Sequence, residues 1–118
     1  MDFTRPVAVM MLGILGYVAD YDEARSIVRR LVGAVAPGSY LVINDGTEAS
    51  TADIEANRTA RQAGLQYHLR SREQFAGLFD GLELVDPGVV STPRWRPDVG
   101  AMDDYAELAV FCGVGRKP

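Results

Sequence analysis

The chain has almost none of the side chains from which disulfide frameworks and metal centres are built. Its 118 residues include a single cysteine, Cys112, and a single histidine, His68. One cysteine cannot close an internal disulfide or form a cysteine-based metal cluster, and one histidine cannot supply a site that needs several imidazoles. The sequence therefore predicts no metal site and no disulfide framework, which favours a cytoplasmic protein.

Long apolar runs and an excess of positive charge are also missing. No apolar run reaches the roughly 20 residues that span a bilayer, and the initial MDFTRP lacks the basic flank of a signal peptide. The net charge is -4 and the sequence pI is about 4.9, whereas nucleic-acid binding needs clustered Lys and Arg. We therefore expect a cytoplasmic protein with no membrane partner and no nucleic-acid partner.

The first half of the chain reads as a strand, a helix and a second strand. Val7–Leu12 is a continuous apolar run, typical of a strand buried on both faces of a parallel sheet. Asp20 or Asp22 can cap the next helix, which Pro37-Gly38 stops, and Tyr40–Ile43 is the second strand. The apolar stripe of the helix between these strands comprises Ile27, Val28, Leu31, Val32 and Val35. The order predicts a right-handed parallel unit.

The second half adds further helices. Residues 44–46 (Asn-Asp-Gly) should leave the sheet as a turn, and residues 53–63 should form a surface helix with few apolar positions. Ser71 and Gln74 form a capping box at the start of another helix. The apolar face of that helix comprises Phe75, Leu78 and Phe79.

Two more strands complete the α/β pattern. Leu82–Val85 is a third strand, and Tyr105–Val114 is a fourth that follows a long connector over residues 91–104. No helix separates these strands, so we expect them to pair antiparallel. Residues 12–18, 44–48 and 91–104 should then gather at the sheet edge where ligands bind in open α/β folds.

Two segments one helix apart, ILGYVAD and VAPGSYLVIND, resemble patterns around the fourth and fifth strands of class I S-adenosylmethionine-dependent methyltransferases, VLHHVPD and LKPGGxLxIxD. The resemblance implies a three-layer Rossmann-like α/β half-fold, with parallel strands 4, 5 and 6 and an antiparallel strand 7 inserted between 5 and 6. Residues 1–118 would then be a single unit, the C-terminal part of such a domain.

A narrower resemblance covers nearly the whole chain. FDGLELVDPGVV followed by WRPD is its most specific element, and DFTRPVAVMML, APGSYLVI and CGVGRK also take part. These segments resemble a bacterial S-adenosyl methyltransferase family whose members are longer. The resemblance implies S-adenosylmethionine as cofactor and a small-molecule methyl acceptor.

The chain lacks parts that make most of the cofactor contacts in that family. It has no GxGxxG between a strand and a helix, and no acidic residue at the end of a preceding strand to hold the cofactor ribose. We therefore expect little or no activity, and weak or no cofactor binding, from this chain alone. The alternative is a non-catalytic remnant or binding module that associates through its exposed strand edge.

The resemblance also nominates site residues. Met11, Leu12 and Gly13, at the end of the first strand, would line the methionine end of the cofactor. The alternative for them is simple core packing and a turn glycine. Tyr17 stands where the family pattern often has a histidine. It would contact the substrate near the methyl group or pack over the end of the sheet.

Other candidates lie on the acceptor side. Asp45 would act as a base or hold an acceptor amine or hydroxyl, or form an Asx turn with Gly46. Arg94, Trp95 and Arg96 would cover a substrate pocket or bind an anion, or anchor a long loop through Asp98 or Asp103.

Three features favour structural readings. His68 is a candidate base by residue type, but it lies on a link far from the predicted ligand edge, which favours a surface or half-buried structural role. Cys112 should be a core residue. Val7–Leu12 would be an unpaired apolar edge, which predicts a homodimer, a strand-swapped assembly or a partner that supplies the missing strands.

Overall fold

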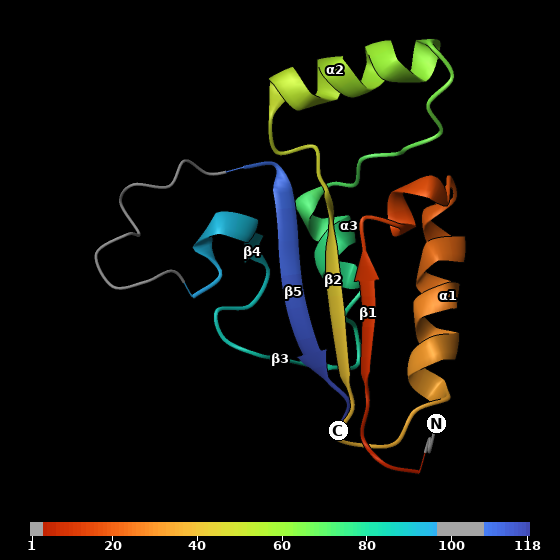
Figure 1. Ribbon diagram of the computed structural model, residues 1–118, viewed down its shortest axis with the longest axis vertical. Coiled ribbons are helices and arrows are strands. Elements are labelled where there is room, and N and C mark those ends of the chain that lie inside the picture. The colour runs from red at the N-terminus through yellow and green to blue at the C-terminus, as the bar shows by residue number, and fades with distance from the viewer. Residues whose placement is uncertain (1–3, 97–107) are drawn as a thin grey trace.

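The computed structural model describes residues 4–96 and 108–118, which form a mixed sheet with helices packed on it (Figure 1). β1 (Ala8–Leu12) pairs in parallel with β2 (Tyr40–Gly46). β5 (Val110–Arg116) runs antiparallel to β2, to β3 (Glu83–Leu84) and to β4 (Val90–Ser91). The main strand order is β1-β2-β5-β3.

This topology confirms the predicted α/β fold. β1 and β2 are parallel, and the last strand is inserted between β2 and β3 and antiparallel to both, as the methyltransferase resemblance implied. β3 is shorter than the predicted strand Leu82–Val85. β5 begins and ends later than predicted, and residues 105–107 of the expected strand lie outside the described part of the chain.

The helix between the parallel strands, α1 (Tyr21–Gly33), begins as the sequence predicts. The carboxylate of Asp20 accepts a hydrogen bond from the backbone N–H of Asp22 at 2.9 Å and caps the helix. Ala24 and Val28 are its buried positions. Its last turn is held by Lys117, whose ammonium donates to the carbonyls of Val32 and Val35 at 2.8 and 2.7 Å.

α3 (Arg72–Gly77) is preceded by the predicted capping box. The Ser71 hydroxyl accepts from the N–H of Gln74, and the Gln74 side chain accepts from the N–H of Ser71, both at 3.1 Å. Phe75 and the following Leu78 and Phe79 are buried in the core, as predicted.

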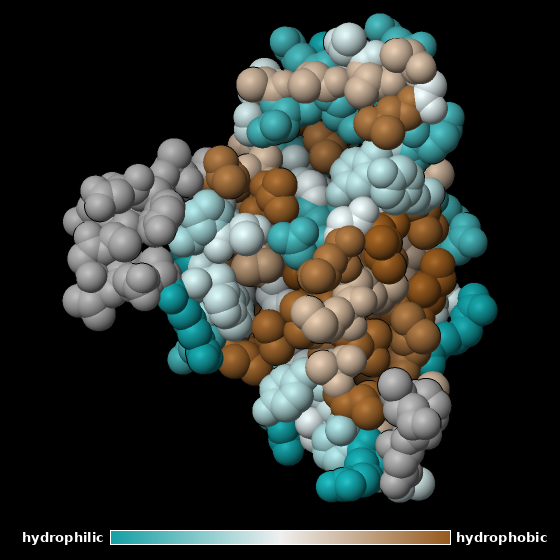
Figure 2. Space-filling view, viewed as in Figure 1, coloured by the Kyte–Doolittle hydropathy of each residue, from teal (hydrophilic) through white to brown (hydrophobic). Residues whose placement is uncertain are grey.

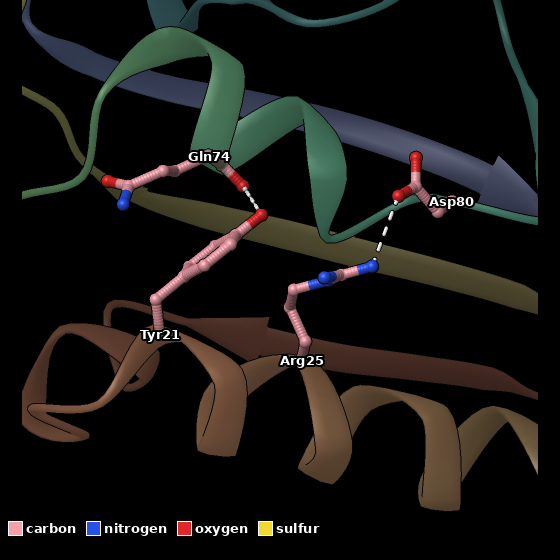
Figure 3. Close-up of polar contacts among 4 residues, drawn as sticks. All are labelled: Tyr21, Arg25, Gln74 and Asp80. Carbon is pink, nitrogen blue, oxygen red and sulfur yellow. Dashed lines mark hydrogen bonds and ion pairs between the residues drawn. The ribbon is translucent and has the colours of Figure 1, made fainter.

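α1 and α3 pack on the same face of the sheet, because their buried residues join one core cluster with Met11, Ile43 and Phe111. Polar contacts tie them together (Figure 3). The Tyr21 hydroxyl donates to the carbonyl of Gln74 at 2.6 Å, and Arg25 pairs with Asp80 at 3.4 Å. Of the three layers of a Rossmann-like fold, the described residues supply the sheet and the layer on this face.

The opposite face of the sheet is open, so the expectation that the first strand is buried on both faces is wrong. Met11 is 5% exposed, whereas its neighbours Met10 and Leu12 are 61% and 53% exposed. The alternation places them on the side that α1 and α3 leave uncovered, and Figure 2 shows an apolar surface there. Cys112 lies on this face and is half-buried rather than a core residue.

β2 is longer than the sequence predicted. Residues 44–46, expected to form a turn, continue the strand because β5 pairs with them: Asn44 faces Cys112, Asp45 faces Phe111 and Gly46 faces Val110. The pleat directs Asp45 to the helix-covered face, where it is 4% exposed. The extra residues therefore carry a carboxylate into the interior at the end of the sheet.

α2 (Thr51–Gln62) is the predicted surface helix and contains no buried residue. It lies beyond the ends of β1 and β2, across the edge of the sheet (Figure 1). The described ranges contain no helix that is long and apolar enough to cross a membrane. They also contain no group of three or more His, Cys, Asp or Glu side chains that could hold a metal ion.

Candidate functional site

A cavity of about 480 Å³ opens where β1 and β2 end, between the sheet and α2. Its floor comes from the sheet edge and its outer wall from one side of α2. The lining residues are Gly13, Asn44, Asp45, Gly46, Thr47, Asp53, Ala56, Asn57, Ala60, Leu65, Tyr67, Leu69, Ala109 and Val110. The strand ends that connectivity predicted to meet are therefore side by side: the N–H of Gly13 donates to the carbonyl of Asn44 at 2.7 Å.

Asp45 holds two parts of this edge together. One carboxylate oxygen accepts from the backbone N–H of Gly16 at 3.1 Å, and the other from the N–H of Gly46 at 3.0 Å. Burial raises the pKa of the Asp45 carboxyl above its ordinary value of 3.8, against the lowering effect of these two hydrogen bonds and of the Arg70 charge. Asp45 sits within a strand, so the Asx-turn reading does not hold, although the bond to Gly46 does form.

Tyr67 forms much of the wall beside Asp45. Its hydroxyl accepts from the N–H of Gly46 at 3.0 Å, and its ring packs edge-on against Tyr17 with centroids 5.2 Å apart. A Cβ atom at Gly16 would lie 2.3 Å from this ring. Glycine at position 16 is thus the residue that lets Tyr67 reach the strand ends.

The segment that carries Tyr67 crosses the ligand edge, so the expectation that His68 is far from that edge is wrong. The backbone N–H of His68 donates to the carbonyl of Gly16 at 2.6 Å. Arg70, only 6% exposed, donates to the carbonyls of His68 and Val18. The sequence predicts residues 65–70 only as an extended link between two helices, and the structure adds that its partners lie on the turn after β1.

The predicted cofactor-side residues point in different directions. Met11 is in the core and Leu12 is on the open face. Gly13 lines the cavity with φ +70°, and a Cβ atom there would meet nothing within 4 Å. Tyr17 is 59% exposed and rests on Tyr67. Of these residues, Gly13 alone is among the cavity's described lining residues.

Arg94, Trp95 and Arg96 are not brought to the cavity. They belong to or follow the short 3-10 helix η2 (Thr92–Arg94). The Arg96 guanidinium donates to the carbonyl of Asp86 at 2.9 Å and lies over the Trp95 ring, 5.4 Å from its centroid. The expected partners Asp98 and Asp103 lie outside the described residues.

Among the described residues of the connector, Thr92 reaches the edge. The Thr92 hydroxyl accepts from the side-chain amide of Asn44 at 3.2 Å and donates to the carbonyl of Val110 at 2.9 Å. Sequence reasoning missed this threonine, together with Tyr67, Arg70 and the α2 alanines of the cavity wall. The packing of Tyr67 against Gly16 and Gly46 leaves no local periodic signal in the sequence, because the contact joins segments far apart in the chain.

S-adenosylmethionine fits only partly against the residues present. Gly13 offers open space at the end of β1, and Asp45 and Asp53 suit the positive charge of a sulfonium. The sequence supplies no glycine-rich loop to hold the rest of such a molecule. The described residues thus offer surroundings for only part of such a molecule.

Comparison with solved structures finds relatives that share the fold of this chain. A DUF574 family protein from Streptomyces avermitilis is 40% identical, with a TM-score of 0.84, over 100% of this chain and 47% of that one. A structure from Thermobifida fusca is 35% identical, with a TM-score of 0.80, over 99% of this chain and 45% of that one. The chain therefore spans less than half the length of these relatives.

A more distant structure shares the fold alone. The mitomycin 7-O-methyltransferase MmcR is 21% identical, with a TM-score of 0.62, over 100% of this chain and 33% of that one. No curated protein matches the sequence. The family model described as S-adenosyl methyltransferase matches residues 1–118. With that match over its whole length, the chain belongs to the S-adenosyl methyltransferase family.

Proposed function

We propose that this chain supplies the acceptor-side half of an S-adenosylmethionine-dependent methyltransferase that acts on a small molecule. The observation that carries the proposal is the cavity at the joined ends of β1 and β2, in a chain of this family. Methyl transfer needs no metal or nucleophilic side chain, because the sulfonium already activates the methyl group, and catalysis depends on alignment of the acceptor.

Gly13 lies at the boundary between the proposed position of the cofactor and that of the acceptor. β1 is an outer strand of the described sheet, so an added strand can pair with its free edge, while the cavity lies on the other side, towards β2 and α2. The cofactor would lie over Gly13 against that added part, with Met11 and Leu12 supporting the strand below it. The acceptor would lie in the cavity.

Asp45 is the residue that we assign to acceptor positioning. Each of its oxygens already accepts one backbone N–H, which fixes the carboxylate, and a carboxylate oxygen has further acceptor capacity for an O–H or N–H of the acceptor. Tyr17, beside Tyr67, would border the acceptor near the methyl group. Arg94, Trp95 and Arg96 would shape the connector rather than touch the acceptor.

The test joins this chain to the part of the Streptomyces avermitilis protein that the match leaves uncovered. We expect the hybrid to bind S-adenosylhomocysteine in calorimetry, and the isolated chain to show no binding tighter than about 100 μM, or roughly -5.5 kcal/mol. A folded hybrid that does not bind would overturn the proposal. Binding by the isolated chain would contradict the assignment of the cofactor side to the added part.

A matched pair of variants locates the cofactor in the hybrid. Gly13 and Gly88 both have positive φ, +70° and +83°, and open space around them. Leu at either position carries similar backbone strain, but only Gly13 lines the cleft. We expect Gly13→Leu to weaken S-adenosylhomocysteine binding at least tenfold and Gly88→Leu to leave it unchanged.

The open sheet face favours a second candidate function, that of a non-catalytic binding module. An apolar face and a free strand edge are both association surfaces. In this function the chain alone would form a stable homodimer or strand-swapped assembly. Light scattering that shows a monodisperse monomer at high concentration would exclude it, whereas a tight dimer that the added part cannot displace would favour it.

A further inference from the structure

The cavity beside Asp45 carries acidic side chains and no basic ones among its described lining residues. Asp45 lies on its floor and Asp53 on the first turn of α2. Arg70 is a buried cation whose charge acts on Asp45. Its guanidinium donates hydrogen bonds to the carbonyls of His68 and Val18, and it is not among the residues that line the cavity. A ligand in this space therefore meets negative charge.

The basic side chains of α2 lie on an adjacent face of the helix, since Asn57 lines the cavities on both faces. A second cavity of about 500 Å³, which we call the outer cavity, is lined by Arg58, Arg61 and His68 together with Glu48 and neutral residues. Arg58 is also paired with Glu55 at 3.8 Å. Of the charged residues of α2, Asp53 therefore lines the cavity at the strand ends, whereas Arg58 and Arg61 line the outer cavity.

The cavity beside Asp45, which we call the inner cavity, carries only neutral residues among the rest of its described lining, and most of them are apolar. Ala56 and Ala60 are one turn apart on α2, so the helix presents a smooth wall of two methyl groups. Further apolar residues of the lining are Leu65, Leu69, Ala109 and Val110, and its neutral polar residues are Asn44, Thr47 and Asn57. The Tyr67 ring adds an aromatic surface beside Asp45. A space of this kind suits a small apolar body with a polar group directed at the carboxylate.

We propose that the inner cavity selects a largely apolar methyl acceptor that is neutral or cationic, such as a phenol or an amine, and rejects anionic molecules. The identification of the ligand as an acceptor rests on the proposed function, whereas the charge selectivity rests on the cavity itself. An anion would bring a like charge close to buried Asp45, where repulsion is stronger than in water, and to exposed Asp53, whose repulsion solvent screens.

The test uses three probes that share a phenol ring and differ in charge: tyramine, 4-ethylphenol and 3-(4-hydroxyphenyl)propionate. Each is titrated into the full 118-residue chain while backbone amide NMR shifts are recorded. We expect tyramine and 4-ethylphenol to shift the amides of Gly13, Gly46 and Ala60. The propionate should bind at least about tenfold more weakly than tyramine.

Matched variants on the exposed helix α2 assign the selectivity without disturbing the core. Asp53→Asn should reduce the ratio of the dissociation constants of the propionate and tyramine at least threefold. Glu55→Gln, which removes the same charge outside the inner cavity, should leave this ratio unchanged. Ala60→Phe should fill the cavity and abolish the shifts. Thr59→Phe, at an exposed position that lines neither cavity, should leave binding unchanged.

The outcomes separate this proposal from the proposed function. Equal or tighter binding of the propionate, no shift at the cavity amides with any probe, or equal effects of Asp53→Asn and Glu55→Gln would overturn it. Failure of the hybrid to bind S-adenosylhomocysteine, with the probe ranking intact, would overturn the methyltransferase assignment alone. Two results support the proposal: tighter binding of tyramine than of the propionate by the wild-type chain, and a smaller affinity difference between these two probes in Asp53→Asn.

Discussion

The ring of Tyr67 occupies the space in which a side chain at Gly16 would stand, since a Cβ atom there would lie 2.3 Å from the ring. The same short segment is tied by the backbone bond from His68 to the carbonyl of Gly16. The turn after β1 and the segment after α2 are therefore fitted to each other at one glycine, and this fit sets the shape of the cavity floor.

Substitution at this glycine should be costly. We expect Gly16→Ala to lower the free energy of unfolding by about 1–3 kcal/mol in urea titrations followed by circular dichroism, because the ring or the turn must move. Gly33→Ala is the matched control, since a Cβ atom there would meet nothing within 4 Å. It should be neutral or stabilising by up to about 1 kcal/mol. Equal effects at the two glycines would contradict the close approach of Tyr67.

Neighbouring methionines on β1 should respond in opposite ways. Met11, 5% exposed, packs in the core, so Met11→Ala should cost about 2–5 kcal/mol of unfolding free energy. Met10, 61% exposed on the open face, should tolerate Lys within about 0.5 kcal/mol. Light scattering should show less self-association for Met10→Lys than for the wild type, because a charge interrupts the apolar face. A large stability loss in Met10→Lys would place that side chain in the core instead.

The Asp45 carboxyl should make the chain less stable as pH rises. Burial raises its folded-state pKa above the ordinary 3.8. Between these two pKa values the unfolded chain has lost the proton while the folded chain keeps it, so the free energy of unfolding falls with pH. The difference in this free energy between wild type and Asp45→Asn should therefore decline as pH increases from 3.8 through the raised pKa. A difference that grows over this window would show that the hydrogen bonds from Gly16 and Gly46 outweigh burial.

Cys112 should report whether the open face becomes covered. It is the chain's single cysteine and lies half-buried on that face, and burial raises the pKa of its thiol. Iodoacetamide should modify it slowly at neutral pH, since the thiolate is the reactive form. Joining the chain to the remaining part of the Streptomyces avermitilis protein should slow the reaction at least tenfold further, with the urea-unfolded hybrid as the control. Unchanged reactivity in a folded hybrid would mean that the added part does not cover β5.

Local signals in the sequence predicted the elements well. The cap at Asp20 and the capping box at Ser71 and Gln74 depend on neighbours within one turn, and both form as predicted. The apolar stripe of α1 forms only in part, because Leu31 is 40% exposed and Val35 follows the end of the helix at Gly33. The family resemblance also predicted the insertion of the last strand between β2 and β3. These features follow from short-range patterns and from connectivity.

The misassigned features all depend on partners distant in the chain. Residues 44–46 have turn-forming composition, yet pairing with β5 keeps them in the strand. Tyr67 and Arg70 sit in a polar segment, and their partners lie on the turn after β1. The apolar run of β1 suggested burial on both faces, but a run of apolar residues does not say how many faces are covered. The wall that α2 adds to the cavity was missed, because alanines on a surface helix carry no sequence signal of their own.

Because α2 buries none of its residues, the outer wall of the cavity and the core of the fold are encoded in separate positions. Mutations at Ala56, Ala60 or Asp53 can alter the shape and charge of that wall while the sheet keeps its packing. Acceptor preference is then free to drift between related proteins at little thermodynamic cost. We expect the evolutionary divergence of substrate range in this family to be concentrated in this one helix.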